Sequence, residues 1–317
     1  MSPPTRSRWL RFRLRTLLIA IAVVAAPMSW LAKEQRQSRN ELQLADSFAK
    51  SGRALNQFGG PFDSWETQPS HSWWRDYARR AMGDRLIQAG PPPTDFNDLE
   101  SLAALSNLQV LYLQETSVRD LGPLARQNNL RVLWIALTHV NDLAPLAKLT
   151  RLQELHLYST PVTDLAPLAG LEDLRVLSFG ATEVGDLAPL AGLIRLEYLD
   201  LTDTPTFDLT PISGLKNLRD LRIGATKVTD LTPLVGLRNL QILNMRGTEV
   251  TDLTPLAALN KLRVLDISST GVTDLAPLAK LKTLERCQLN KTPVTKDQVQ
   301  ALQNALPNCR INHDPFP

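Results

Sequence analysis

Aspartate recurs every 22 residues in the middle of the chain, and carboxylates at a fixed spacing are its most regular candidate for a chemical site. The column contains Asp120, Asp142, Asp164, Asp186, Asp208, Asp230, Asp252 and Asp274. If the repeats stack, neighbouring carboxylates lie roughly 5 Å apart, a spacing at which a ladder of cations is one interpretation. Each Asp also precedes Leu-x-Pro, where it can accept a backbone N–H at the start of a helical turn. We favour this capping role and expect no metal site.

Histidine shows no catalytic or metal-binding spacing. The four histidines are His71, His139, His156 and His313. The sequence contains no G-x-S-x-G, no phosphate-binding glycine loop, no H-E-x-x-H and no C-x-x-C motif. We therefore predict that the protein is not an enzyme and uses no cofactor.

The two cysteines, Cys287 and Cys309, are 22 residues apart and fall in the same slot of neighbouring repeats. Stacking would bring their Cα atoms within disulfide range, but their side chains would point the same way. We interpret them as two small buried hydrophobic residues, and a disulfide remains the alternative.

A 22-residue repeat without insertions positions all of these side chains. Nine units begin at Leu108, Leu130, Leu152, Leu174, Leu196, Leu218, Leu240, Leu262 and Leu284. Each follows L-x-x-L-x-L-x-x-T-x-V-x-D-L-x-P-L and then five variable residues, with few exceptions. A fixed period of this length that opens with L-x-x-L-x-L is typical of a leucine-rich-repeat solenoid.

The pattern predicts the structure of one coil. The alternating leucines indicate a short strand with one buried face, which pairs in parallel with the strand of the next coil. Asp-Leu-x-Pro-Leu indicates a short 3₁₀ turn on the opposite side. One coil cannot bury its apolar residues alone, whereas stacked coils can. We predict an α/β solenoid, an arc with a parallel concave sheet and 3₁₀ turns on its convex side.

The repeat resembles the internalin-type class of bacterial leucine-rich repeats, over roughly residues 86–311. The usual Asn of that class is Thr in every copy: Thr116, Thr138, Thr160, Thr182, Thr204, Thr226, Thr248, Thr270 and Thr292. A hydroxyl can also bond turn backbone, so we expect a threonine ladder in place of the asparagine ladder. The resemblance implies a scaffold for protein recognition and specifies no ligand.

The N-terminus has the features of a membrane signal. Residues 1–40 carry eight Lys or Arg and one Glu, a net charge of +7, which leaves −4 for the rest of a chain whose total is +3. Arginines precede an apolar stretch, so residues 1–32 are interpreted as a basic flank and an anchor that enters the membrane through residues 14–32. A cleaved signal peptide and a non-membrane helix are the alternatives. The charge bias predicts a cytoplasmic N-terminus and repeats outside the cytoplasm.

The remaining segments divide by composition. Residues 33–72 are predicted to form a juxtamembrane helix and linker, and residues 73–107 a cap helix and a degenerate first repeat. Residues 108–283 form eight regular repeats, and residues 284–317 a degenerate last repeat and a cap. Within the cap, Thr295-x-x-Gln298 predicts the start of a helix that ends before Pro307. Thr206 and Phe207 interrupt the consensus, and we expect that coil to be distorted.

The concave face is the predicted binding surface, because its residues vary while the leucines do not. The candidate residues are Tyr112, Trp134, His156, Tyr158, Tyr198, Asp200, Asp220, Arg222, Arg246 and Asp266. We expect Tyr112, Trp134, His156 and Tyr158 to form one exposed aromatic patch. We expect a single polar centre beside it, made of five residues: Asp200, Asp220, Arg222, Arg246 and Asp266. Aromatic residues and Arg are typical of binding hot spots.

The sequence therefore predicts a protein partner. The repeats have no basic stripe, which argues against nucleic acid. A structural spacer without a discrete ligand and a carbohydrate-binding surface are the alternative functions.

Overall fold

The computed structural model describes residues 88–89, 99–100 and 108–314. The predicted membrane anchor, the linker and most of the N-terminal cap lie outside these residues. Among the described residues, no helix combines the length and the apolar character needed to cross a membrane.

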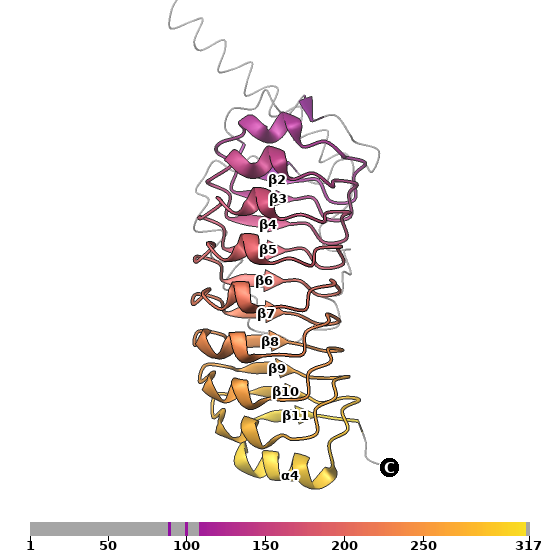
Figure 1. The fold of residues 1–317 in the computed structure, drawn as a ribbon, viewed down its shortest axis with the longest axis vertical. Coiled ribbons are helices and arrows are strands. Elements are labelled where there is room, and N and C mark those ends of the chain that lie inside the picture. The colour runs from indigo at the N-terminus through magenta and orange to yellow at the C-terminus, as the bar shows by residue number, and fades with distance from the viewer. Residues whose placement is uncertain (1–87, 90–98, 101–107, 315–317) are drawn as a thin grey trace, which may run out of the picture.

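The described strands form one parallel sheet in which spatial order follows sequence order (Figure 1). The strands are β1 (Gln88–Ala89), β2 (Val110–Tyr112), β3 (Val132–Trp134), β4 (Glu154–His156), β5 (Val176–Ser178), β6 (Tyr198–Asp200), β7 (Asp220–Arg222), β8 (Ile242–Asn244), β9 (Val264–Asp266), β10 (Arg286–Gln288) and β11 (Arg310–Asn312). From β1 to β10, pairing residues are 22 positions apart, as in Val110 with Val132. The predicted leucine-rich-repeat solenoid is confirmed.

The leucine slots build one continuous core. Leu111 and Leu113 are fully buried, as are the equivalent residues of each following coil up to Leu265 and Ile267. The largest fully buried side chain is Phe179, which occupies a leucine slot. Every coil therefore contributes apolar surface that only its neighbours can cover, which explains why the strands stack without a break.

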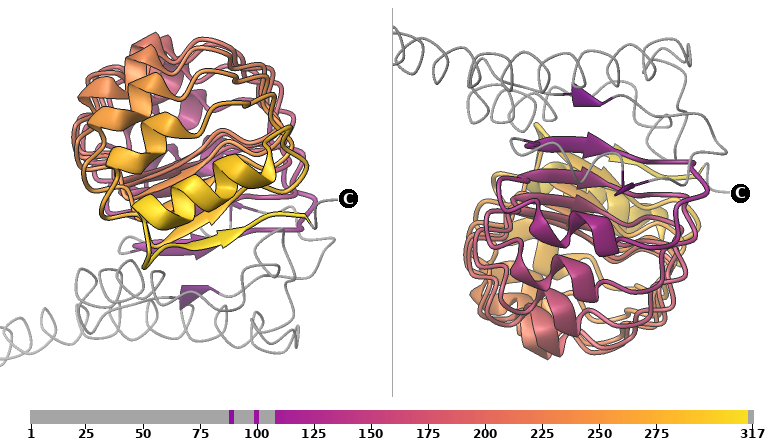
Figure 2. Two further views of the ribbon diagram at one scale, coloured as in Figure 1. Left: turned by 90° about the horizontal axis from the view of Figure 1, so that it is seen from below. Right: turned by 90° about the horizontal axis from the view of Figure 1, so that it is seen from above.

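A 3₁₀ helix closes each regular coil on the side opposite the sheet (Figure 2). These are η4 (Gly122–Arg126), η5 (Ala144–Lys148), η6 (Ala166–Leu168), η7 (Ala188–Leu190), η8 (Thr210–Ile212), η9 (Thr232–Gly236), η10 (Thr254–Ala258) and η11 (Ala276–Lys280). Proline is the second residue of each, where its missing N–H costs no hydrogen bond.

The aspartate column starts these helices. In all eight coils an Asp Oδ1 accepts the N–H of the first helical residue at 2.7–2.8 Å. The hydrogen bond from Thr210 lowers the pKa of Asp208. Hydrogen bonds from Thr232 and Thr254 lower the pKa of Asp230 and of Asp252 in the same way. The predicted bond from a backbone N–H to Asp is confirmed, and it explains why Asp precedes Leu-x-Pro. The N-cap position itself is the Leu that follows each Asp, such as Leu121.

The threonine column bonds within each coil rather than between coils. In all nine copies the Thr Oγ1 donates to the carbonyl three residues earlier, at 2.6–2.8 Å. The residue just before each Thr has a positive φ: Glu115, Leu137, Ser159, Ala181, Asp203, Ala225, Gly247, Ser269 and Lys291, at 52–71°. The threonine hydroxyl thus closes a left-handed turn that only one coil builds with glycine.

The expected distortion at Thr206 and Phe207 is wrong. Thr206 fills the slot that is valine in neighbouring coils, is fully buried, and donates from Oγ1 to the Val184 carbonyl at 3.3 Å. Threonine has almost the shape of valine, and its hydroxyl finds an acceptor, so the coil keeps its geometry. Phe207 points outward and is 68% exposed.

The C-terminal cap begins with the predicted helix. Helix α4 (Lys296–Ala305) starts at a capping box in which Thr295 and Gln298 bond each other's backbone N–H groups. It closes the lower end of the stack (Figure 1). The helix takes the place of the shorter 3₁₀ turn of the regular coils, so β11 pairs with β10 after 24 residues instead of 22.

This shift corrects the predicted position of the cysteines. Cys287 pairs in register with Ile311, and Cys309 precedes β11. Both thiols are free and buried, as the hydrophobic interpretation expects. Burial raises the pKa of Cys309 to about 11 and raises the pKa of Cys287 well above its usual value.

Candidate functional site

The structure places the predicted site residues on the side of the sheet that faces away from the leucine core. Side chains alternate along a strand, so the residues between the leucines share this concave face. Tyr112, Trp134 and His156 occupy the same position of β2, β3 and β4 and pair in register. Tyr198, Asp200, Asp220 and Arg222 lie on the adjacent strands β6 and β7.

Three rings form a ladder at the N-terminal half of this face. The ring centroids of Tyr112 and Trp134 are 5.6 Å apart, and those of Trp134 and His156 are 4.0 Å apart, with tilted planes. All three side chains are half-buried. The aromatic patch therefore exists as a stacked ladder, but the prediction that it is exposed is wrong. Neighbours on both sides of Trp134 cover its ring faces.

Tyr158 lies on the neighbouring column and leans over the next coil. Gly180 makes room for it, because a Cβ at Gly180 would stand 3.2 Å from the Tyr158 ring and 2.9 Å from the Thr202 carbonyl oxygen. The glycine is therefore required by close approach and not by its φ angle.

Several buried polar atoms of the concave face have no hydrogen-bond partner. Among the described side chains these are Gln114 Oε1, Trp134 Nε1, His156 Nε2, Asp266 Oδ2 and Ser268 Oγ. Burying a polar group without a partner costs roughly 1–3 kcal/mol. All five atoms lie in the concave columns, and none lies in the leucine core of the described coils.

Glu154 is the one acidic side chain of the concave columns between β2 and β5. It pairs in register with Val132 and Val176, is 3% exposed, and makes no hydrogen bond or ion pair with another residue that the structure describes. Burial raises its pKa to about 7 and lowers the pKa of His156 to about 3. The site is therefore built to hold a neutral imidazole beside a carboxyl group that titrates near neutrality.

The polar centre is a compact cluster that satisfies itself. Arg222 donates to both oxygens of Asp220 at 3.2 Å, and its guanidinium carbon lies 5.2 Å from the Tyr198 ring centre. The Tyr198 hydroxyl donates to Asp200 Oδ2 at 3.3 Å, and Asp200 Oδ1 accepts the Thr202 N–H. Burial raises the pKa of Tyr198 and of Asp200. Burial alone would lower the pKa of Arg222, but Asp220 and Tyr198 raise it above its usual value.

Two residues predicted for this centre lie outside the cluster. Arg246 is exposed, and its backbone N–H bonds to Asn244 Oδ1 at 3.0 Å. Asp266 is 1% exposed and lies on β9, three strands from β6; its Oδ1 accepts the Ser268 N–H at 2.8 Å. The prediction of a single polar centre with five members is therefore wrong in these two residues.

The edge of the sheet carries a ladder of paired charges. Glu197 lies between Arg175, at 3.0 Å, and Arg219, at 3.5 Å, and Arg263 makes a two-point ion pair with Glu285. These pairs link coils 22 residues apart. Because most of these partners are partly or largely exposed, each pair adds little stability.

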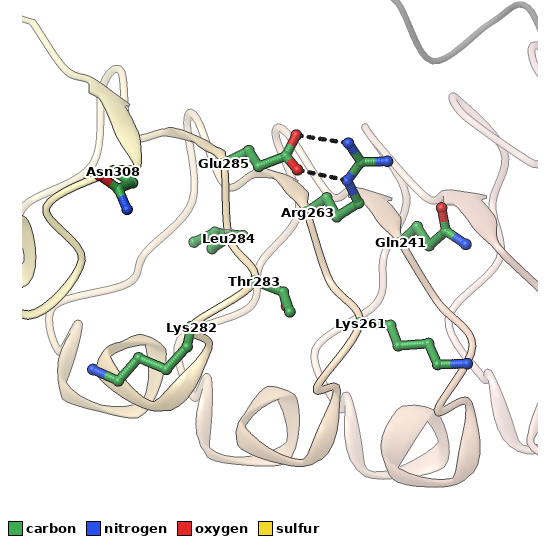
Figure 3. Close-up of a pocket in the computed structure, with 8 residues that line it drawn as sticks. All are labelled: Gln241, Lys261, Arg263, Lys282, Thr283, Leu284, Glu285 and Asn308. Atoms are coloured by element: carbon green, nitrogen blue, oxygen red, sulfur yellow. Dashed lines mark hydrogen bonds and ion pairs between the residues drawn. The ribbon is translucent and has the colours of Figure 1, made fainter.

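A shallow pocket opens beside the last of these pairs (Figure 3). Gln241, Lys261, Arg263, Lys282, Thr283, Leu284, Glu285 and Asn308 line it. Its cations already have partners: Lys261 Nζ donates to Asn239 Oδ1 at 2.8 Å, and Lys282 Nζ donates to the Ala305 carbonyl at 3.0 Å. Of these cations, Arg263 is ion-paired with Glu285, whereas Lys261 and Lys282 bond neutral oxygens.

Over the described part of the chain, no three His, Cys, Asp or Glu side chains gather as they would around a metal ion.

The predicted site residues did not include three polar residues of the concave face: Gln114, Glu154 and Ser268. The sequence gives little indication that these three residues belong to the concave face. Only Glu154 stands out, because the equivalent residues of the neighbouring coils are valines: Val110, Val132 and Val176.

The fold is a leucine-rich-repeat solenoid. Leucine-rich-repeat proteins generally serve as binding scaffolds and not as enzymes. The family described as "Leucine Rich repeats (2 copies)" matches residues 238–280. A search of curated proteins finds no match to the chain.

Among solved structures, the chain is similar to internalins of Listeria monocytogenes. An internalin (inlF) is 25% identical with a TM-score of 0.61, over 70% of this chain and 78% of the internalin. Internalin C2 is 29% identical with a TM-score of 0.56, over 69% of this chain and 91% of that protein. A third similar structure is the ectodomain of the Arabidopsis thaliana receptor kinase GASSHO1/SCHENGEN3, solved in complex with CASPARIAN STRIP INTEGRITY FACTOR 2. It is 14% identical with a TM-score of 0.59, over 69% of this chain and 28% of that chain. This last similarity extends to the fold alone.

Proposed function

We propose that the protein recognises another protein through the concave face and catalyses no reaction. The observation that carries this proposal is the row of buried polar atoms without partners on that face, which includes Gln114 Oε1, Trp134 Nε1 and Asp266 Oδ2. The opposite side of each coil leaves no such atom among the described residues, since its turns are closed by Asp and Thr side chains. A partner gains most where it replaces missing hydrogen bonds.

The aromatic ladder argues for a protein partner over a carbohydrate. A sugar ring stacks on an open aromatic face, but Tyr112 and His156 flank the Trp134 ring at 5.6 and 4.0 Å. The N–H at the edge of the Trp134 ring is buried without a partner among the described residues. A carbonyl oxygen of a polypeptide would suit this donor if binding uncovers it.

The test is a double substitution, Trp134→Ala with Tyr158→Ala. Both side chains lie outside the leucine core, so the variant should fold and should lose at least tenfold in affinity for the partner, as truncated hot spots do. Phe207→Ala is the matched control, because Phe207 is an aromatic residue exposed on the turn side. Equal affinity of the double variant and the wild type would refute the proposal.

We also propose that residues 14–32 anchor the protein in a membrane, with the N-terminus in the cytoplasm and the repeats outside it. The basic flank, the apolar stretch and the charge bias in the sequence support this topology. Fractionation with protease added to intact cells tests it. The repeats should fractionate with membranes and be digested from outside; recovery in the soluble fraction or full protection would overturn the topology.

A further inference from the structure

The turns on the two sides of the sheet carry opposite charge. The segments that lead from each strand toward its 3₁₀ helix run from residues 115–120 to residues 269–274 in steps of 22, and they carry twelve acidic and two basic residues. The segments that lead from the end of each 3₁₀ helix toward the next strand run from residues 126–131 to residues 280–285, and they carry thirteen basic and four acidic residues. We name these two sides the acidic flank and the basic flank.

The two flanks lie at opposite ends of the strands, because the chain leaves every strand through one flank and enters the next strand through the other (Figure 1). Eleven of the twelve acids and eleven of the thirteen bases are exposed. In the sequence no basic stripe is apparent, because these bases are scattered among other residues, and the stacking of the coils gathers them. Both charged surfaces are therefore open to a partner.

The carboxylates of the acidic flank repel one another along the stack. Each Asp of the column accepts one backbone N–H through Oδ1, and this bond leaves the carboxylate its negative charge. The hydrogen bond from Thr232 lowers the pKa of Asp230, whereas slight desolvation and the charges of Asp208 and Asp252 raise it. Cationic side chains placed along this column would relieve the repulsion between neighbours.

The basic flank keeps an excess of positive charge. Three of its four acids, Asp173, Glu197 and Glu285, form ion pairs with arginines of the same flank. The flank still has nine more bases than acids, and such an excess attracts a surface of the opposite sign. The acidic flank, which has ten more acids than bases, is a surface of that kind on this same protein.

The 22-residue repeat gives both flanks the same spacing. Every regular coil adds one segment to each flank, so the charges of both flanks recur at about 4.8 Å, the distance between neighbouring strands. A copy that is shifted sideways along the strand direction brings its basic flank against the acidic flank of its neighbour, repeat against repeat. In five of the eight repeats the two facing segments have opposite net charges, and only in the repeat with residues 159–164 and 170–175 are both negative.

We propose that the protein associates side by side with further copies of itself, the acidic flank of one copy against the basic flank of the next. The interface joins two different surfaces, so copies can add in a row. A single exposed ion pair contributes little, so the association depends on several repeats acting together and weakens as the salt concentration rises. It leaves the concave face open, and it does not depend on the recognition function proposed above.

Cross-linking with a zero-length carbodiimide, which joins Lys amines to carboxylates in direct contact, tests this proposal. Full-length protein labelled with heavy nitrogen is mixed with unlabelled protein in a non-ionic detergent at low salt, so that a link between two copies carries mixed labels. We expect mixed-label links from Lys148 to Asp142 and from Lys261 to Asp252, which belong to facing segments. In about 1 M salt, where charges are screened beyond about 3 Å, the yield of these links should fall at least fivefold.

A double variant that reverses charge on the acidic flank is Asp203→Lys with Glu249→Lys. Lysine is tolerated at both places of the repeat, because other coils already hold Lys291 and Lys227 there. Lys291 also shares the positive φ of Asp203, at 57° and 58°. The variant should therefore fold as the wild type does, and its melting curve checks this.

The matched double variant of the basic flank is Lys216→Glu with Arg238→Glu. Glutamate is tolerated at this place of the repeat, because Glu172 holds it in another coil. Each double variant alone should give at least fivefold fewer mixed-label links at Lys148 and Lys261, because like charges then face each other. An equal mixture of the two variants should restore the links, because the two reversed flanks attract each other.

The outcomes decide the proposal in both directions. Mixed-label links that join the two flanks, fall in high salt and return in the mixture of variants support it. Absence of mixed-label links at low salt, or links confined to other surfaces, would overturn it, as would single variants with the wild-type yield or a mixture no better than each variant alone. Unassociated copies whose basic flank binds inorganic polyphosphate would overturn it too and would assign this flank to a polyanion.

Discussion

Glu154→Gln should stabilise the protein at pH 8 and leave its stability almost unchanged at pH 4.5. Burial raises the pKa of Glu154 from 4.5 to about 7, so the folded state binds this proton more tightly than the unfolded chain does. The stability that the protonated carboxyl provides is present below pH 4.5, is lost as the pH rises to 7, and stays lost above that. Glutamine keeps the shape of the side chain and cannot ionise.

The size of the effect follows from the same shift. A change of 2.5 pKa units, from 4.5 to 7, corresponds to about 3 kcal/mol at roughly 1.4 kcal/mol per unit. Since Glu154 is only 3% exposed, solvent screening reduces this little. In a chain of this size, 3 kcal/mol raises the melting temperature by roughly 6–12 °C.

Thermal and urea unfolding of wild type and variant between pH 4.5 and pH 8 measures this difference. His156, whose pKa is lowered to about 3, and Tyr112, whose pKa is raised, are present in both proteins, so the comparison isolates Glu154. Glu249→Gln, at an exposed position, should change neither curve. A Glu154→Gln variant no more stable than wild type at pH 8 would show that Glu154 is not a desolvated, unpaired carboxylate.

Three further substitutions or additions test the coil geometry. Thr160→Val should cost about 1–2 kcal/mol in unfolding free energy, because it leaves the Leu157 carbonyl without its 2.6 Å donor; Thr160→Ser should retain most of the stability, and equal losses would contradict this role. Gly247→Ala should cost about 1 kcal/mol, because φ is +71° there and nothing lies within 3.4 Å of the added Cβ; Gly214→Ala, with open space and no positive φ, is the neutral control. Calcium at millimolar concentration should leave the melting temperature unchanged, because each Asp of the column already accepts a backbone N–H; a clear rise would restore the cation ladder as the explanation.

The fold could be predicted from the sequence because every leucine slot repeats in phase. The strands and the 3₁₀ turns follow from the positions of Leu and of Asp-Leu-x-Pro-Leu, as does the buried core. The left-handed turn could not be predicted, because its residue is Glu, Leu, Ser, Ala, Asp or Lys in different coils and Gly only at Gly247. The shift at β11 also escaped prediction, since the length of chain that α4 consumes is set by packing and not by the repeat.

The concave residues were predictable as a set but not in their pairing. Alternation along the strand identifies which side chains share the face. It does not determine that Arg222 pairs with Asp220 of its own strand, or that Asp266 Oδ2 has no partner among the described residues. Nor does it reveal that Glu154 is buried, because burial depends on how closely the rings of neighbouring coils pack.

The constant register from β1 to β10 has an evolutionary consequence. Every regular coil presents the same upper and lower surfaces to its neighbours, so a gene segment that encodes 22 residues can be duplicated or deleted without creating a new kind of contact. Each duplication would lengthen the concave sheet by about 4.8 Å. Unequal recombination could thus adjust the reach of this surface in fixed steps while the two ends of the protein stay the same.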